Sequence, residues 1–180
     1  MILPVIEGKD LSLPERRLSL RYGSHLSCLI KALLLTKGDV LELGMGLFST
    51  PTLHHMCRVM KRNLVSYDAW DVWVKWTRKY LYENEFHKIF LVEDYDDAKI
   101  DKPWDVVLVD HDPSGRRRTE IKRLANLAKY IIIHDSNGRS ESHYHYSEIY
   151  PLFKYTFTDG FEFPSTTVLS NLVDLRDFKI

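Results

Sequence analysis

Acidic residues recur at one kind of place in this sequence, at or just after the end of a short apolar run. They are Glu42, Asp68, Glu93 or Asp94, Asp110 and Asp135. If the apolar runs are parallel strands of one sheet, these carboxylates gather at its carboxyl edge, where α/β sheets bind ligands. Acidic residues also favour loops and helix N-termini for local reasons, so a single one decides little. Five in succession indicate a binding edge.

The most informative of these runs leads into a glycine turn. Val40–Leu43 has the apolar content of a buried central strand, and Gly44 and Gly46 allow a tight turn that a ligand can approach closely. Thr50 followed by Pro51 predicts a helix start, with threonine as the N-cap and proline in the first helical position. A strand that feeds a helix through glycines presents free backbone N–H groups to a ligand.

The stretch Glu42-Leu43-Gly44-Met45-Gly46 resembles the first motif of the class I S-adenosylmethionine-dependent methyltransferases, where an acidic residue precedes G-x-G. It differs from a dinucleotide fingerprint because Ser49 stands in place of the third glycine. The same two glycines also fit a plain strand-to-helix turn. The resemblance implies that Glu42, Gly44, Gly46 and Ser49 contribute to binding S-adenosylmethionine.

The next two strand ends fit the same interpretation. Asp68 stands 24 positions after Gly44, where an acidic residue accepts hydrogen bonds from ribose hydroxyls. In the resemblance that ribose is the adenosyl ribose, and Trp70 lies against adenine, although a tryptophan packed within its own helix is an alternative. Asp94 stands where the family often contacts the adenine amino group, with Glu93 as a competitor.

Two further stretches look like the strand-end motifs of small-molecule methyltransferases related to the catechol type. They are Asp110-His111-Asp112 and His134-Asp135-Ser136-Asn137. The resemblance implies Mg²⁺ held by Asp110, Asp135 and Asn137, although Ser136 interrupts the usual Asp-Asn pair. The stretch also resembles a loosely defined bacterial methyltransferase group that is not uniformly metal-dependent. Oxygen ligands of this kind suit Mg²⁺.

Methyl transfer needs a base only when the acceptor must lose a proton. His111 and His134 adjoin the strand ends and titrate in the useful range, and a structural role is the alternative for each. With Asp110 and Asp135 they form the predicted catalytic set. The likeness to the catechol type favours a small-molecule acceptor methylated at oxygen. The polar loop 138–147, which includes His143 and His145, is long enough to cover it. Arg116–Arg118 either bind an anionic group of the acceptor or form a solvated face.

Hydrophobic periodicity predicts the elements that position these residues. Helical spacing begins at about Ser24, and later strands alternate with helices, which makes the sheet parallel. The predicted strands after the first are Leu64–Tyr67, Ile89–Val92, Asp105–Val109, Tyr130–His134, Lys154–Thr158 and Thr167–Asn171. The last two are close enough in sequence to pair antiparallel. The predicted fold is therefore α/β and Rossmann-like: a doubly wound, mostly parallel seven-stranded sheet with a C-terminal antiparallel hairpin. It forms one domain over 1–180, with an arm over 1–23 and a core over 24–172.

Composition narrows the alternatives. Among 180 residues, 25 basic and 25 acidic residues leave no net field that would attract nucleic acid. Cys28 and Cys57 lie on apolar helix faces, as buried thiols in a reducing compartment would. No charged leader or long apolar run is present, so we expect a cytoplasmic protein without membrane contact, and its oligomeric state stays open. A non-catalytic Rossmann-like binding module is the rival, since a short chain leaves little to cover an acceptor. A metal-dependent hydrolase using Asp110, Asp112, His134 and Asp135 is a weaker one, which has no use for the glycine turn.

Overall fold

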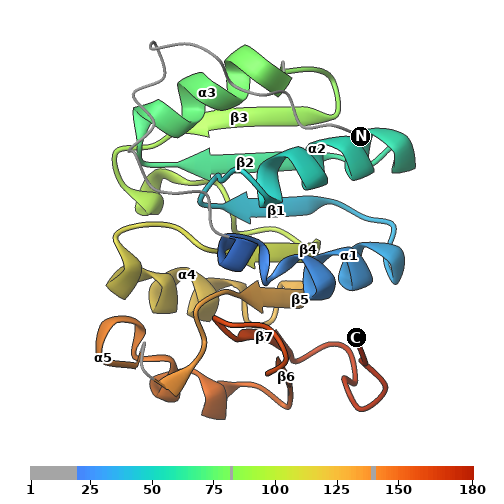
Figure 1. The fold of residues 1–180 in the computed structure, drawn as a ribbon, viewed down its shortest axis with the longest axis vertical. Helices are drawn as coiled ribbons and strands as arrows, with labels where there is room; N and C mark the ends of the chain where they lie inside the picture. Colours follow the sequence, from blue (N-terminus) through green and yellow to red (C-terminus); the bar gives the residue numbers. More distant parts are fainter. Residues whose placement is uncertain (1–19, 82, 139–140) are drawn as a thin grey trace.

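The computed structural model describes residues 20–81, 83–138 and 141–180, and they build one sheet with helices on both faces (Figure 1). The strand order is β3-β2-β1-β4-β5-β7-β6. The strands are β1 (Val40–Leu43), β2 (Leu64–Asp68), β3 (His87–Leu91), β4 (Trp104–Val109), β5 (Ala128–Ile133), β6 (Tyr155–Asp159) and β7 (Thr166–Ser170). The first five are parallel, and β7 pairs antiparallel with both β5 and β6. The predicted architecture is confirmed, and the observed strand ends lie within two residues of the predicted ones.

The α-helices are α1 (Leu26–Leu34), α2 (Ser49–Met60), α3 (Asp71–Leu81), α4 (Arg117–Leu124) and α5 (Glu141–Tyr144). Alternate strand residues face opposite sides, so the two faces have separate cores. Leu29 of α1 and Leu53 of α2 pack with Val40 and Ile132 on one face. On the other face, Ile121 of α4 and its neighbours pack with the intervening strand residues.

The chain reverses its winding direction at β1. Strand order runs outward from β1 to β2 and β3 on one side and to β4 and β5 on the other (Figure 1). The carboxyl ends of β1 and β4 therefore form a topological switch point, the usual ligand position in such sheets. Gly44 and Asp110 follow these two ends directly, so the site sought from the sequence lies there.

Gly44 lets the two strand ends approach each other. Its φ of 95° lies in the left-handed region that favours glycine. A Cβ at this position would lie 2.6 Å from the backbone of Asp110 and His111. Gly44 is thus required by the packing of the protein itself, before any ligand is considered.

Two further expectations concern cysteines and membranes. Cys28 and Cys57 are buried free thiols, and burial raises the pKa of each to about 12, which makes them unreactive. No helix in the described part of the chain is long and apolar enough to span a bilayer.

Candidate active site

The glycine turn is tied to the second strand by a carboxylate. Asp68, at the end of β2, accepts the backbone N–H of Met45 at 2.6 Å through Oδ2 and that of Trp70 at 2.7 Å through Oδ1. Burial raises the pKa of Asp68 to about 6, although both N–H donors oppose this by favouring the ionised form. Each carboxylate oxygen has a second lone pair, so Asp68 can hold the turn and still accept hydroxyl groups.

The other turn residues leave the ligand side of the turn open. A Cβ on Gly46 would meet nothing closer than Ser49 Oγ, at 3.7 Å. Trp70 lies at the entrance to α3 with 44% of its surface exposed, beside the amide that Asp68 binds. Gly46 and Trp70 are therefore accessible to a ligand, as the sequence predicted. Ser49 is instead buried in the first turn of α2.

Glu42 lies beneath the turn and not on it. Its carboxylate is fully buried and accepts Thr50 Oγ1 at 2.9 Å and Ser66 Oγ at 2.6 Å. Burial raises its pKa to about 7, and the hydroxyl donors limit the rise. A carboxylate enclosed in this way does not reach a ligand. The direct cofactor contact predicted for Glu42 therefore gives way to a supporting role.

Thr50 does not cap α2, contrary to the sequence prediction. The helix begins at Ser49 with Phe48 as its N-cap, so Thr50 lies within the first turn. Its hydroxyl accepts Gly46 N–H at 2.8 Å and donates to Glu42. Thr50 does not cap the helix because its hydroxyl is already bound to the buried Glu42 carboxylate and to the Gly46 amide.

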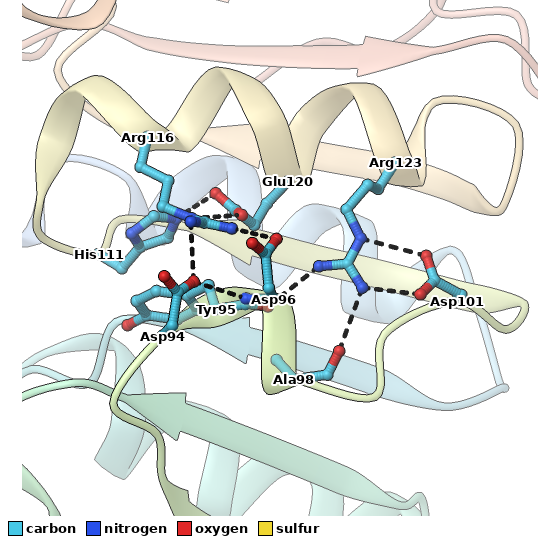
Figure 2. A network of polar contacts seen from close by, with 9 residues as sticks. All are labelled: Asp94, Tyr95, Asp96, Ala98, Asp101, His111, Arg116, Glu120 and Arg123. Atoms are coloured by element: carbon cyan, nitrogen blue, oxygen red, sulfur yellow. Dashed lines mark hydrogen bonds and ion pairs between the residues drawn. The ribbon is translucent and has the colours of Figure 1, made fainter.

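Asp94 and the segment after β3 are held by arginines from the segment after β4, Arg116 at its start and Arg123 in α4. Asp94 accepts Asp96 N–H at 2.8 Å and forms an ion pair with Arg116 at 2.7 Å, while Arg123 binds Asp101 and backbone carbonyls (Figure 2). Asp94 is still about half exposed, and Glu93 is exposed as well. The network fixes the connection between β3 and β4 against α4.

His111 points into the protein, so it cannot serve as the base predicted from the sequence. Its ring stacks on Tyr95 with centroids 3.9 Å apart, and its Nε2 lies 3.1 Å from Glu120 (Figure 2). Both the histidine and the glutamate side chains are fully buried. His111 therefore belongs to the packing under α4, and its backbone carbonyl accepts Arg117 Nε at 2.7 Å.

The ends of β4 and β5 meet around a buried arginine. Arg117 Nη2 lies 2.9 Å from Asp110 Oδ1, and His134 Nδ1 lies 3.2 Å from Asp110 Oδ2. Burial alone would raise the pKa of Asp110, but Arg117 and His134 outweigh it and hold the pKa well below its usual range. Burial lowers the pKa of His134, yet the carboxylate beside it raises the pKa overall. The sequence analysis treated Arg117 only as part of a basic run.

Asp135 is the more accessible carboxylate of this group. Its φ of 55° is uncommon for a residue other than glycine, and such backbone conformations concentrate at functional sites. Tyr144 donates its hydroxyl to Asp135 Oδ2 at 2.9 Å, and its ring stacks on Tyr146 and faces the Arg117 guanidinium at 4.7 Å. Tyr146 in turn donates to the His134 carbonyl at 3.2 Å.

The segment predicted to cover the acceptor is thus placed beside these residues through two tyrosines. Arg139 and Ser140 of that segment lie outside the described residues. His143 and His145 are exposed, so Tyr144 and Tyr146 make the contacts. The basic run is paired within the chain: Arg116 binds Asp94, Arg117 binds Asp110, and Arg118 binds Glu148.

Mg²⁺ held by Asp110, Asp135 and Asn137 does not fit this arrangement. The Arg117 guanidinium lies 2.9 Å from Asp110 Oδ1 and 3.7 Å from Asp135 Oδ2, so a protein cation already lies between the carboxylates. Asp135 is further engaged by Tyr144, and Asn137 is a half-buried residue beyond the strand. Mg²⁺ needs several free oxygen ligands in near-octahedral geometry.

Two residues before α1 complete the group, and the sequence analysis missed both. Ser24 Oγ lies 2.9 Å from His134 Nε2, and the His25 ring meets the His134 ring edge-on with centroids 4.8 Å apart. The only signal in the sequence is a pair of polar residues before an apolar helix. The Ser24–His134–Asp110 alignment resembles a hydrolase triad, but Ser24 donates its single proton to the Pro164 carbonyl at 2.7 Å.

Comparison with known proteins supports the fold. No protein-family model matches the chain, and no curated protein matches it either. Solved structures do match. Cofactor-bound Rv0187 from MTB is 14% identical with a TM-score of 0.63, over 89% of this chain and 84% of that one. Human methyltransferase-like protein 13 in complex with SAH is 13% identical with a TM-score of 0.61, over 85% and 84%. The chain has the class I methyltransferase fold.

A third match, the SAH-bound methyltransferase PaMTH1 from Podospora anserina, is 11% identical with a TM-score of 0.61, over 81% of this chain and 76% of that one. Identities this low show a shared fold and leave the acceptor open. In this chain, the glycine turn and Asp68 lie at the ends of β1 and β2, on one side of the switch point. Asp110, Arg117 and His134 lie on the other side, at the ends of β4 and β5.

Proposed function

We propose that this protein transfers a methyl group from S-adenosylmethionine to a small-molecule acceptor, at oxygen. The observation that supports this best is the glycine turn at the switch point, tied through Met45 to the Asp68 carboxylate. A turn of this kind places unobstructed backbone beside an acid that can accept two hydroxyl groups, which is what an adenosyl ribose requires.

Four residues around the glycine turn and the next two strand ends would bind the cofactor. Gly46 offers the ligand open space, Asp68 accepts the ribose hydroxyls, and Trp70 covers the adenine ring. Asp94, about half exposed just after β3, receives the adenine amino group. Glu42 and Thr50 act beneath the turn by holding the Gly46 amide in position.

The acceptor side begins where the Asp110 and Asp135 carboxylates flank Arg117. Methyl transfer is an in-line displacement at a sulfonium carbon, and the cofactor supplies the reactivity when bound. The chain must therefore hold the acceptor in line and remove its proton. Asp135, partly exposed and hydrogen-bonded to Tyr144, is the proposed base for an acceptor hydroxyl. Asp110 and His134, already bonded to each other, fix the position of Arg117 beside it.

A small acceptor is favoured by what surrounds Asp135. The stacked rings of Tyr144 and Tyr146 offer a flat aromatic surface beside a carboxylate and a guanidinium, which suits a small ring bearing hydroxyl groups. The balance of 25 basic and 25 acidic residues supplies no general attraction for nucleic acid.

Titration calorimetry with S-adenosylmethionine and S-adenosylhomocysteine tests the cofactor side. Gly46→Val should abolish binding because its side chain enters the open space beside the turn. Asp68→Ala should weaken binding by about 1.5–3 kcal/mol, or roughly 10- to 150-fold, through loss of charge-assisted hydrogen bonds. Glu85→Gln is the matched control and should bind normally, because this exposed acid lies just before β3, at the opposite edge of the sheet.

A methyl-transfer assay on the same proteins separates the rival function. A binding module that lacks turnover would bind both compounds and transfer no methyl group from labelled S-adenosylmethionine to a panel of hydroxylated aromatic acceptors. Equal affinities in the parent, Gly46→Val and Asp68→Ala proteins would remove the methyltransferase proposal altogether.

A further inference from the structure

His25 is a buried polar side chain whose hydrogen-bonding groups are unused. The residue immediately precedes α1 and is 2% exposed. Neither ring nitrogen has a hydrogen-bond partner among the residues that the structure describes. Buried polar atoms in proteins are nearly always paired, so an imidazole left like this indicates a missing ligand.

The contacts of the neighbouring His134 show which of its ring nitrogens carries a proton. Ser24 has a single hydroxyl proton, and it donates that proton to the Pro164 carbonyl, which can only accept. Ser24 Oγ must therefore accept from His134 Nε2–H. The other nitrogen, His134 Nδ1, faces Asp110 Oδ2 at 3.2 Å. In a neutral ring this contact sets a lone pair against a carboxylate, an arrangement that a metal ion bound to both atoms would stabilise.

His25 lies close enough to supply the third donor atom. One nitrogen from each histidine and one oxygen of Asp110 all lie within 4.8 Å of one another. Donors about 2.0–2.1 Å from one tetrahedral ion are separated by about 3.3 Å. Small side-chain movements are therefore enough to bring the three together. These residues come from the start of α1, the end of β4 and the end of β5, which the sheet fixes in place.

We propose that His25, Asp110 and His134 form a binding site for one divalent transition-metal ion. Two imidazoles and a carboxylate suit Zn²⁺ and similar ions, whereas Mg²⁺ prefers oxygen donors alone. The two Asp110 oxygens have separate tasks: Oδ1 binds Arg117, and Oδ2 faces the histidines. Ser24 supports the site by fixing the orientation of the His134 ring, as hydrogen-bond partners of metal-bound histidines do.

Such a site adds to the proposed methyl transfer and does not depend on it. Three protein ligands leave a coordination position open, which is typical of zinc sites that bind water or a substrate oxygen. The ion would lie beside the carboxylate pair proposed to hold the acceptor. Its role would be to bind and acidify an acceptor oxygen, although metal binding itself needs no acceptor and no cofactor.

The test is calorimetric titration of the metal-free protein with Zn²⁺, and separately with Mg²⁺. We expect one Zn²⁺ per chain and no binding of Mg²⁺ at the same concentration. His25→Ala should weaken Zn²⁺ binding at least 100-fold, and Ser24→Ala should weaken it about 10- to 100-fold. His143→Ala is the matched control, since this exposed histidine lies outside the cluster and its loss should change nothing.

Titration of the parent protein with Zn²⁺, followed through the imidazole resonances, guards against a variant that fails to fold. The signals of His25 and His134 should shift together and saturate at one equivalent, while those of His143 and His145 stay in place. Absence of Zn²⁺ binding, or binding unchanged in His25→Ala, would overturn the inference and indicate that a second proton on His134 supplies the cation. Affinity for S-adenosylhomocysteine is measured on the same samples, so failure of the metal site and failure of the proposed function are distinguished.

Discussion

At the scale of single residues, an acidic side chain can bind a ligand only if its carboxylate oxygens keep free and accessible lone pairs. Glu42 has both oxygens occupied by hydroxyl donors in a fully buried position, so it stabilises the fold around the turn. Asp68 accepts one backbone amide on each oxygen and retains lone pairs for a ligand. The sequence predicts an acid at each of these strand ends, but the occupancy of the oxygens depends on Ser66 and Thr50, whose hydroxyl directions no pattern reveals.

A chain of buried hydrogen bonds connects Glu42 through β2 to β3. Ser66 donates to Glu42, so His87 Nε2–H must donate to Ser66 Oγ at 2.9 Å. The remaining nitrogen of His87 then accepts from His54 Nδ1 at 2.9 Å. Burial lowers the pKa of His87 to about 3 and keeps it neutral, so His87 offers no positive charge to offset an ionised Glu42.

Substitution of Glu42 should change how stability depends on pH. Burial raises the folded-state pKa of Glu42 from 4.5 to about 7, so between these values the folded state holds a proton that the unfolded state releases. Stability therefore falls as pH rises from about 4.5 to about 7, by at most about 1.4 kcal/mol per pH unit. In Glu42→Gln this contribution disappears, and the variant gains on the parent as pH rises.

Urea unfolding of both proteins at several pH values between 4 and 8 measures this difference. Subtracting the two curves removes the contributions of titrating groups that do not interact with Glu42. A free energy of unfolding of Glu42→Gln that, relative to the parent, stays constant with pH or rises as pH falls would contradict the burial argument.

At the scale of elements, periodicity and alternation were sufficient for the sheet and insufficient for the site. Apolar runs between helical segments predict the strands, and the short link between the last two predicts the hairpin, because these signals are local in the chain. The inward turn of His111 is different, since it depends on Tyr95 and Glu120 from two other elements. His25 reaches His134 only after the sheet has brought the start of α1 to the end of β5.

The two glycines of the turn should differ sharply on substitution. Gly44→Ala forces a Cβ to 2.6 Å from the β4 backbone at a φ of 95°, and backbone strain alone costs about 1–3 kcal/mol. We expect a loss of at least about 2 kcal/mol in the free energy of unfolding. Gly46→Ala has open space, so its stability should change by less than about 1 kcal/mol. Denaturant unfolding of the two variants measures both effects.

This pair distinguishes the two reasons for a glycine in such a turn. Gly44 serves the contact between strands β1 and β4, and Gly46 is proposed to serve the ligand. Equal stability losses in the two variants would mean that Gly46 is also a packing residue, and its use as a probe of cofactor binding would fail.

At the scale of the whole molecule, residues distant in sequence close the acceptor side. Ser24 donates to Pro164 and Ser27 donates to Asp159 at 3.1 Å, so the segment around α1 is fastened to the β6–β7 hairpin. Phe178, near the C-terminus, packs in the same core as α1. The cofactor side uses β1 and β2, which are close in sequence and were predictable. The acceptor side joins residues about 110 positions apart, which a single sequence without an alignment does not connect.

Because one sheet joins both sides, ligand binding at the switch point should stabilise the molecule as a unit. Mass action gives about 2.7 kcal/mol when S-adenosylhomocysteine is present at 100 times its Kd. For a domain of this size each kcal/mol raises Tm by about 2–4 °C, so the parent protein should gain about 5–11 °C in one cooperative transition. Gly46→Val should unfold near the parent temperature without ligand and gain nothing from it, because its side chain takes the space of the ligand while the sheet stays intact. Differential scanning calorimetry over a series of ligand concentrations follows both proteins. A shift of equal size in the variant would place the ligand away from the glycine turn, and a shift in only part of the transition would mean that the two sides of the sheet unfold separately.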